Sequence, residues 1–294
     1  MKPPQAITPF LWFATQAEEA VNFYTSIFKT AKVNIKTLYD EAGAQASGMQ
    51  KGSVMTIAFA LEGQDFVALN GGPAFTFSPA VSFFVSCTTT QEVELLWEKF
   101  SDGATIRMPL DAYPWSEKYG WLQDKYGINW QIMFGSATQK ITPCLLFVGE
   151  HFGNAEKAIS FYTSVFKTSR VLMMEKYGAK EDHAGAVKHA RFALEGTEFV
   201  AMDGPGKHAF TFTPAISFVV NCTAQEQIDH YWEELSKEGK KGQCGWLDDK
   251  FGITWQIVPT ILPTLLSNKK KSQHVMKALL QMTKLDIKKL EDAG

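Results

Sequence analysis

The chain has 294 residues, of which 45% are hydrophobic and 20% charged, a balance typical of globular proteins with enough apolar residues for two cores. A formal net charge of −2 excludes a global positive field for nucleic acid, and four cysteines are too few for a disulfide scaffold. No signal peptide is apparent over residues 1–9 and the apolar runs are too short to cross a bilayer, so the sequence predicts a cytoplasmic protein without membrane contact.

The first half of the chain predicts a strand, a helix and three strands, and then the same order again. Helices are expected near Ala17–Phe28 and Gln91–Ser101, where apolar residues recur at three- and four-residue steps. The expected strands are Ile7–Phe13, Lys32–Tyr39, Ser53–Leu61, Asp65–Asn70, Val81–Cys87, Ile106–Leu110, Gly120–Gln123 and Asn129–Phe134.

The second half repeats this pattern. FYTSIFKT at Phe23–Thr30 returns as FYTSVFKT at Phe161–Thr168, and GWLQDKYGINWQI from residue 120 matches GWLDDKFGITWQI from residue 245 in 10 of 13 positions. Because the copies are offset by more than 120 residues, they are duplicated domains and not solenoid units. We expect one domain over residues 1–136, a second over 141–266, and a helical tail over 267–294.

The tail predicts a helix from Ser272, with its apolar residues on one face. Residues 268–294 hold seven lysines against three acidic residues, and Lys269–Lys271 could touch nucleic acid or anionic lipid. A solvated helix lying on its own domain or on a partner subunit is the favoured interpretation.

Three segments carry a family resemblance: AEEAVNFYTSIF, NGGP-x-F-x-F and QCGWLDDKFGITWQIVP. They resemble the vicinal-oxygen-chelate superfamily of glyoxalases, bleomycin-resistance proteins and extradiol dioxygenases, and within it the PhnB-like group often labelled 3-demethylubiquinone-9 3-methyltransferase. The resemblance implies an α+β fold with two tandem domains of paired βαβββ modules. In each domain a curled mixed sheet surrounds a cleft, with helices outside and a C-terminal helix added. It also implies that the two copies pair within the chain or that the chain forms a homodimer.

The methyltransferase label meets a physical objection. The usual S-adenosylmethionine site needs a strand, a glycine-rich turn and a helix whose N–H groups hold the cofactor. The nearest candidate, Asp203-Gly-Pro-Gly-Lys, lacks a third glycine and runs into the strand-like FTF segment. A turn between two strands is the favoured interpretation.

The resemblance also implies four metal-ligand positions in each copy. Transferred by spacing, they fall at Thr8, Ala68, Ala80 and Gln131, and at Thr142, Ala201, Ala215 and Gln256. Alanine cannot ligate a metal, and a threonine with one amide is a poor transition-metal site. All six histidines lie at position 151 or later. We therefore expect that the standard divalent metal site is not retained, and the cofactor stays unknown.

The second copy carries a polar cluster that the first copy lacks. His189, Arg191 and Asp203 stand where the first copy has Thr56, Ala58 and Asn70. Strand alternation places all three on the cleft face, beside Gln256. Three interpretations stay open: an Arg191–Asp203 ion pair with His189 as a bystander, a polar ligand-binding cleft, and a metal or acid–base site built on His189 and Asp203.

The remaining candidates come from both copies. His208, Trp246 and Cys244 are expected beside the second cleft, and Phe10, Trp12, Asn70 and Gln131 beside the first. Cys87, Cys144 and Cys222 are interpreted as buried thiols, whereas Cys244 in a turn is a minor candidate for a reactive thiol.

The sequence favours a protein that binds a small organic ligand in the second-domain cleft. If Arg191 contacts this ligand, it would favour an anionic one. The alternative is a divergent metal-dependent lyase, isomerase or dioxygenase centred on His189 and Asp203. No nucleic-acid partner is expected. Whether the chain is an enzyme stays open.

Overall fold

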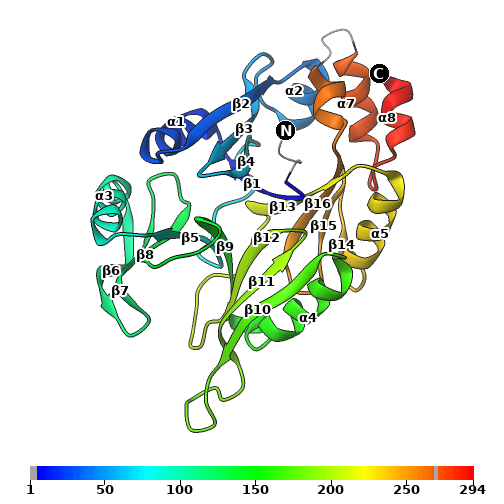
Figure 1. Cartoon of the computed structure of the whole chain (residues 1–294). Helices are drawn as coiled ribbons and strands as arrows, with labels where there is room; N and C mark the ends of the chain where they lie inside the picture. The colour runs from blue at the N-terminus through cyan, green and yellow to red at the C-terminus, as the bar shows by residue number, and fades with distance from the viewer. Residues whose placement is uncertain (1–4, 268–270) are drawn as a thin grey trace.

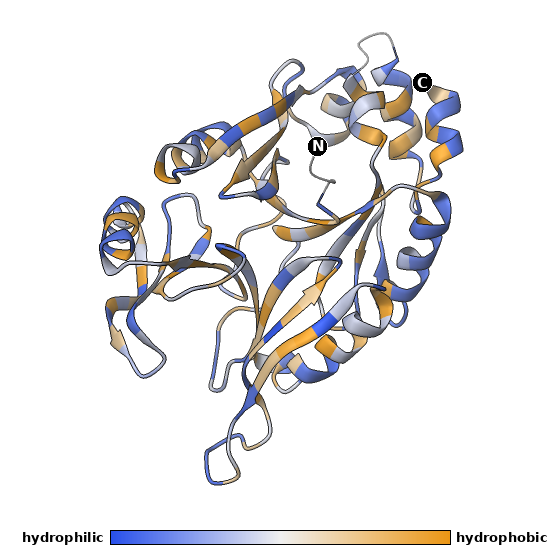
Figure 2. Ribbon diagram, viewed as in Figure 1, coloured by the Kyte–Doolittle hydropathy of each residue, from blue (hydrophilic) through white to orange (hydrophobic). Residues whose placement is uncertain are grey.

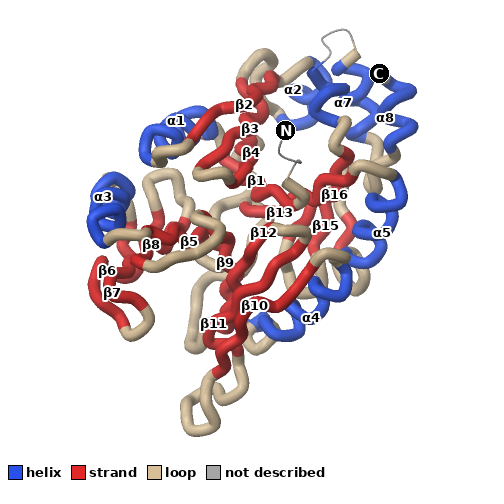
Figure 3. Tube along the Cα trace, in the orientation of Figure 1, coloured by secondary structure: helices blue, strands red, loops and turns tan. Residues whose placement is uncertain are grey.

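A computed structural model describes residues 5–267 and 271–294. In that part of the chain two mixed sheets of eight strands form the interior, and helices lie outside them (Figures 1 and 3). The strands of the first repeat are β1 (Ile7–Phe13), β2 (Ala31–Leu38), β3 (Val54–Leu61), β4 (Gln64–Asn70), β5 (Val81–Cys87), β6 (Thr105–Tyr113), β7 (Ser116–Gln123) and β8 (Asn129–Phe134). Those of the second are β9 (Ile141–Phe147), β10 (Ser169–Lys176), β11 (Val187–Leu194), β12 (Thr197–Asp203), β13 (Ile216–Cys222), β14 (Lys240–Lys241), β15 (Trp246–Asp248) and β16 (Thr254–Pro259).

The helices follow the predicted order, with one addition in the first repeat. They are α1 (Ala17–Ile27), α2 (Glu41–Ser47), α3 (Thr90–Ser101), α4 (Ala155–Val165) and α5 (Gln225–Leu235), with a short 3₁₀ turn at Gly149–His151. The addition is α2, which begins where the side chain of Asp40 accepts a hydrogen bond from the backbone N–H of Gly43 at 2.8 Å.

Each sheet combines modules from both repeats, and the predicted fold class is confirmed. Sheet A, which we define by the strand order β14-β15-β16-β13-β1-β4-β3-β2, joins the two repeats where β1 pairs antiparallel with β13. Sheet B, in the order β10-β11-β12-β9-β5-β8-β7-β6, joins them where β5 pairs antiparallel with β9. Each sheet is therefore completed by strands of the other repeat.

A buried carboxylate explains why the FY and DK-x-G-x-x-W motifs recur together. In the first repeat Oδ2 of Asp124 accepts hydrogen bonds from the Tyr24 hydroxyl and from Nε1 of Trp130, each at 2.8 Å. Tyr24 lies on α1, which packs on sheet A, whereas Asp124 and Trp130 belong to sheet B. The motifs thus hold the two modules of one repeat together across the main core.

The main core lies between the sheets and four of the helices. Helices α1 and α5 pack on sheet A, and α3 and α4 pack on sheet B. Figure 2 shows hydrophobic residues along the strands and a largely hydrophilic outer surface on α5. We call the opposite side of each sheet its helix-free face. This face is where a ligand could reach the strands.

Two helices, α7 (Ser272–Leu280) and α8 (Ile287–Ala293), lie where one helix from Ser272 was expected, and a further helix, α6 (Leu262–Ser267), precedes them. The break between α7 and α8 ends at Asp286, whose side chain accepts from the backbone N–H of Lys289 at 3.0 Å and caps α8. Lys269 and Lys270 of the lysine run lie outside the described residues.

The C-terminal helices pack over one end of sheet A. Helix α7 contacts α2, and a cluster of buried side chains takes in Met55 of β3 and Val258 of β16. Figure 1 shows α2, α7 and α8 together at the top of the molecule. No helix in the described part of the chain is long and apolar enough to span a membrane.

Candidate functional site

The helix-free face of sheet B carries an apolar cluster separate from the main core. Its buried members are Phe84, Tyr119, Cys144 and Val200, and the half-buried side chains packed against them are Met108, Tyr113, Trp121, Met133 and Met202. Strand register places these side chains on one face, because Phe84 lies opposite Gln131, and Gln131 opposite Trp121. Aromatic and methionine side chains on a half-exposed face are typical of small-molecule sites.

A neutral hydrogen-bond chain runs through the middle of this face. The Tyr119 hydroxyl donates to Oε1 of Gln131 at 2.5 Å, and Nε2 of Gln131 donates to Oγ of Ser82 at 2.8 Å. Burial raises the pKa of Tyr119 far above its ordinary value, so this hydroxyl stays protonated. Gln131, which is repeated as Gln256, therefore orients neighbouring side chains.

Trp121 and Arg107 form the polar part of the face beside β6. Nε1 of Trp121 is buried without a hydrogen-bond partner among the described residues. The guanidinium carbon of Arg107 lies 5.9 Å from the centroid of the Trp121 ring, and the side chain donates to Oδ1 of Asn129 at 2.8 Å and to Oε1 of Gln123 at 3.0 Å. No carboxylate in the described ranges lies within ion-pair distance of Arg107, so neutral oxygens hold this cation.

Sequence reasoning missed Arg107. It lies on β6, in a segment of the first repeat that is ten residues longer than its counterpart in the second. The pairing of Thr105 with Gln123 matches that of Lys240 with Asp248, so Gly242 is the position equivalent to Arg107. The difference in segment length hides this equivalence when only the sequences of the two copies are compared. Trp121 is the equivalent of the predicted Trp246, but its unpartnered N–H is a property of packing alone.

His189 and Arg191 both lie on β11 in sheet B. The His189 ring packs edge-on against Phe84, with ring centroids 6.2 Å apart. Burial, and then the nearby charge of Arg191, lower the pKa of His189, so the imidazole is neutral at pH 7. Arg191 donates from Nη2 to Oε2 of Glu198 at 2.5 Å. The expected partner, Asp203, is not the one that Arg191 binds.

Asp203 lies away from the cleft, as a buried structural acceptor. Its Oδ1 accepts from the backbone N–H groups of Gly153 at 2.8 Å and Ala155 at 3.2 Å, and its Oδ2 accepts from that of Val187 at 2.8 Å. It therefore fixes the start of α4 against β11. The equivalent Asn70 accepts from the N–H of Ala17 at the start of α1. Both residues are thus removed from the expected ligand-contacting set.

The other predicted cleft residues lie on sheet A. Phe10 and Trp12 pack edge-on against Trp246, with centroids 5.6 and 5.8 Å apart, and Trp12 also donates from Nε1 to the carbonyl oxygen of Gly72 at 2.9 Å. Nε2 of Gln256 donates to Oγ of Ser217 at 2.9 Å. The grouping of His189 and Arg191 with Gln256 and Trp246, and of Phe10 and Trp12 with Gln131, is corrected, because the two sheets separate them.

Two further candidates lie at the margins. Nε2 of His208 is 3.0 Å from the carbonyl oxygen of Pro205, in the segment between β12 and β13 that was expected to be a turn between strands. Cys244 packs in the C-terminal cluster, its thiol 3.6 Å from the carbonyl oxygen of Leu279, and burial raises its pKa. A raised pKa disfavours the nucleophilic thiolate.

The three other cysteines, Cys87, Cys144 and Cys222, are buried free thiols, as the sequence predicts. Burial raises the pKa of each to about 12.

The transferred metal positions hold no donor set on either helix-free face. Ala68 and Ala201 lie in the main core, one residue out of register with the cleft, and their neighbours on the cleft side are apolar, for example Val67 and Val200. Within residues 5–267 and 271–294, no three His, Cys, Asp or Glu side chains gather in a way that could hold a metal ion. The residues present therefore do not fit the metal centre that the superfamily fold implies.

Comparison with known proteins assigns the family. The family model described as 3-demethylubiquinone-9 3-methyltransferase matches residues 5–133 and again residues 139–258. The chain belongs to this family. A protein from Bacillus cereus described as a putative 3-demethylubiquinone-9 3-methyltransferase, PhnB protein, is 41% identical over 45% of this chain and 100% of its own, with a TM-score of 0.41. The PhnB-like resemblance of the sequence is thereby confirmed.

Two solved structures extend the likeness over both repeats of this PhnB-like chain. Glyoxalase I from Zea mays is 12% identical and covers 84% of this chain and 89% of its own, with a TM-score of 0.57. A putative dioxygenase from Bacillus subtilis is 12% identical and covers 97% and 94%, with a TM-score of 0.50. At this identity the likeness shows a shared fold. No curated protein is significantly similar in sequence.

Proposed function

We propose that the chain binds a small, flat organic anion on the helix-free face of sheet B. The observation that carries the proposal is the pairing of an unbalanced guanidinium, Arg107, with the buried and unpartnered N–H of Trp121 on one apolar face. Both groups need an acceptor, and a carboxylate or phenolate oxygen meets the needs of both.

The apolar cluster supports a flat ligand. Phe84, Tyr119 and Trp121 offer ring surfaces, and Met108 and Met202 are flexible side chains that adapt to a ring laid against them. His189 is neutral against Phe84, so it can donate or accept one hydrogen bond without adding charge.

Arg191 has a weaker claim than Arg107, because Glu198 already balances its charge. A ligand that used Arg191 would have to compete with this carboxylate. We therefore assign anion recognition to Arg107 and give Arg191 a secondary role at the β11 side of the face.

The metal-dependent alternative is not favoured, because Asp203 is occupied by three backbone N–H groups and does not accompany His189 on the face. Methyl transfer of the usual kind is not favoured either. The Gly-Pro-Gly segment after Asp203 connects two strands and does not begin a helix, so it supplies no N-terminal N–H groups for a cofactor.

The test compares 1-naphthoate with neutral 1-naphthamide by isothermal titration calorimetry. Naphthoate should bind more tightly, because only naphthoate carries the charge that Arg107 recognises. Trp121→Phe keeps an aromatic side chain, with a smaller ring, and removes the N–H, and should weaken naphthoate binding about 3- to 10-fold. Arg107→Gln should weaken it about 10- to 100-fold, and Arg191→Ala less.

The matched control is Trp246→Phe, the equivalent substitution on sheet A, which should leave the affinity unchanged. Equal affinity for naphthamide, or an affinity indifferent to both Arg107→Gln and Trp121→Phe, would contradict the assignment. If neither naphthoate nor smaller aromatic carboxylates bind at all, the proposed anion site is refuted.

A further inference from the structure

A second site lies where the two repeats meet, and it is independent of the proposed function. A groove of about 550 Å³ is lined by equivalent positions of the two repeats. The pairs are Gln5 with Gln139, Glu62 with Glu195, and Gln64 with Thr197. The groove thus lies between the β3–β4 turn of one repeat and the β11–β12 turn of the other.

One wall of the groove presents a buried donor without an acceptor. Gln64 is only 4% exposed, and its Nε2 has no hydrogen-bond partner in the described ranges of the chain. Its counterpart Thr197 donates to the carbonyl oxygen of Ile7 at 3.5 Å. Burying an unpaired amide costs about 1–3 kcal/mol, so this side chain has a reason to meet a ligand acceptor.

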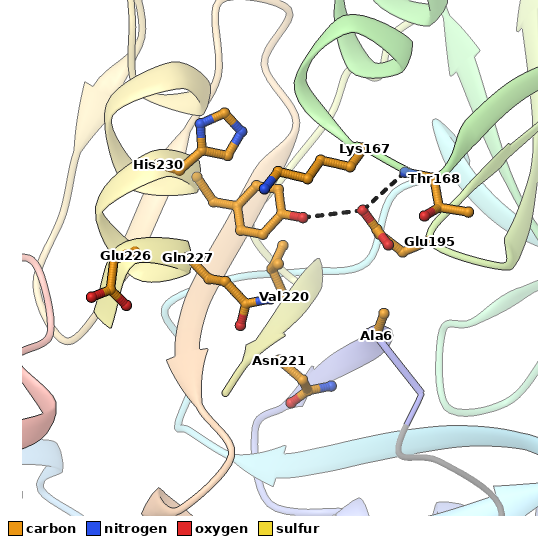
Figure 4. A pocket seen from close by; sticks show the side chains of 10 residues that line it. Ala6, Lys167, Thr168, Glu195, Val220, Asn221, Glu226, Gln227 and His230 are labelled. Atoms are coloured by element: carbon orange, nitrogen blue, oxygen red, sulfur yellow. Dashed lines mark hydrogen bonds between the residues drawn. The ribbon is translucent and has the colours of Figure 1, made fainter. Parts of the chain in front are cut away.

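Two carboxylates belong to residues that line the same groove. Oε1 of Glu62 accepts from the backbone N–H of Thr30 at 3.1 Å. Oε1 of Glu195 accepts from the N–H of Thr168 and from the Tyr231 hydroxyl, each at 3.2 Å (Figure 4). These contacts fix both carboxylates in place through neutral donors.

The charge of the groove is negative. Glu198 is balanced by Arg191 and Lys140 by Glu92, with each pair 2.5 Å apart. Neither Glu62 nor Glu195 has a cation within ion-pair distance among the residues that the structure describes. Figure 4 shows the Lys167 side chain in the adjoining cavity, which shares Ala6 and Glu195 with the groove, but it forms no ion pair with Glu195.

We propose that this groove binds a small primary ammonium ion that carries a hydrogen-bond acceptor close to the amine, as in an amino acid amide. The ammonium group has three N–H donors and no acceptor, which suits the two unbalanced carboxylates. The neighbouring carbonyl oxygen accepts from Nε2 of Gln64. A requirement for both the ammonium group and the carbonyl oxygen distinguishes binding at this site from nonspecific electrostatic attraction of cations.

The test uses three matched probes with the full chain at about pH 6.5, below the ordinary pKa of an α-amine. L-Leucinamide carries both groups, isoamylamine only the ammonium group, and 4-methylpentanamide only the carbonyl group. Calorimetry should show leucinamide binding at least about 10-fold more tightly than either partial probe. Equal binding of isoamylamine, or no binding of leucinamide, would overturn the proposal.

Variants locate the binding. Gln64→Leu should weaken leucinamide binding about 3- to 10-fold, yet raise thermal stability, because an unpaired buried amide is removed. Gln64→Thr introduces the residue found at the equivalent position of the second repeat, and it replaces Gln64→Leu in the test if the leucine variant does not fold. Glu195→Gln should weaken binding about 10-fold, whereas Glu117→Gln on the exposed surface should not. Unchanged affinity in both groove variants would refute the site. Naphthoate binding should be unaffected throughout, so the two proposals fail separately.

Discussion

The buried carboxylate of Asp249 should make the fold less stable as the pH rises from about 4 to about 6. Its Oδ2 accepts from the Tyr162 hydroxyl at 2.7 Å and from Nε1 of Trp255 at 2.9 Å, and its Oδ1 from the N–H groups of Phe251 at 2.8 Å and Ile253 at 3.1 Å. Burial nevertheless raises the pKa of Asp249 to about 6, because lost hydration disfavours the ionised form more than these four donors favour it.

The magnitude follows from the two pKa values. In the unfolded chain the carboxyl has its ordinary pKa of 3.8, so over the next two pH units the folded chain holds one more proton than the unfolded chain. The stabilisation is complete below pH 3.8 and is lost as the pH rises through about 6. About two pKa units correspond to about 3 kcal/mol. Burial also raises the pKa of Asp124, the equivalent residue, which adds an effect of the same sign.

The assay is urea unfolding of wild type and Asp249→Asn at several pH values between about 4 and 7.5. Asparagine does not titrate, so the difference between the two unfolding free energies isolates this one group. That difference should shrink by about 3 kcal/mol across the range, in the sense that wild type loses stability relative to the variant. A flat difference, or one that grows with pH, would refute the reasoning that burial outweighs the hydrogen bonds.

Three further predictions concern Asp203, the packing of Trp12 and the metal content of the protein. Asp203→Ala should lower the free energy of unfolding by about 3 kcal/mol or more in denaturant titrations, because three backbone N–H groups, those of Ala155 and Val187 buried, lose their acceptor. It should leave naphthoate affinity unchanged, and lost binding in a fully folded variant would return Asp203 to the ligand site. Gly71→Ala should destabilise by about 1–3 kcal/mol, since the new methyl group would lie 2.2 Å from the ring of Trp12. Gly204→Ala should cost less, because its nearest neighbour is a methyl carbon of Val148 at the longer distance of 2.9 Å, and equal losses would contradict the close packing of Trp12. Protein purified without chelator should carry far less than one transition-metal ion per chain by elemental mass spectrometry, and near-stoichiometric metal that disappears in His189→Ala would restore the metal-dependent alternative.

Local structure was predictable because each repeat contains the same order of a strand, a helix and three strands twice. The strands Ile7–Phe13, Val81–Cys87 and Asn129–Phe134 coincide with their predicted bounds. The pairing between repeats was not predictable in this way. Because β1 and β9 have nearly the same sequence, their apolar alternation is satisfied equally by a neighbour from either repeat.

The candidate site was predictable only in part. His189 and Arg191 stood out because the equivalent residues Thr56 and Ala58 are so different. Asp203 stood out for the same reason, yet its partners lie 16 to 50 residues away at a helix start and a strand start, which sequence spacing does not reveal. The unpartnered N–H of Trp121 depends on side-chain packing and has no sequence signal.

The exchange of modules explains why sheet B is the better candidate for binding. Arg107 belongs to the longer segment of the first repeat, whereas His189 and Arg191 are substitutions of the second, and cross-pairing brings these independent differences onto one face. Sheet A receives the opposite combination: the shortened β14–β15 segment, the tryptophans Trp12 and Trp246 packed against each other, and the C-terminal helices over one end. A duplicated chain whose two sheets were each built from one repeat could not have concentrated its polar changes in this way. Divergence of the repeats therefore makes the two sheets different: sheet A carries the packed tryptophans and the C-terminal helices, whereas sheet B carries Arg107, His189 and Arg191.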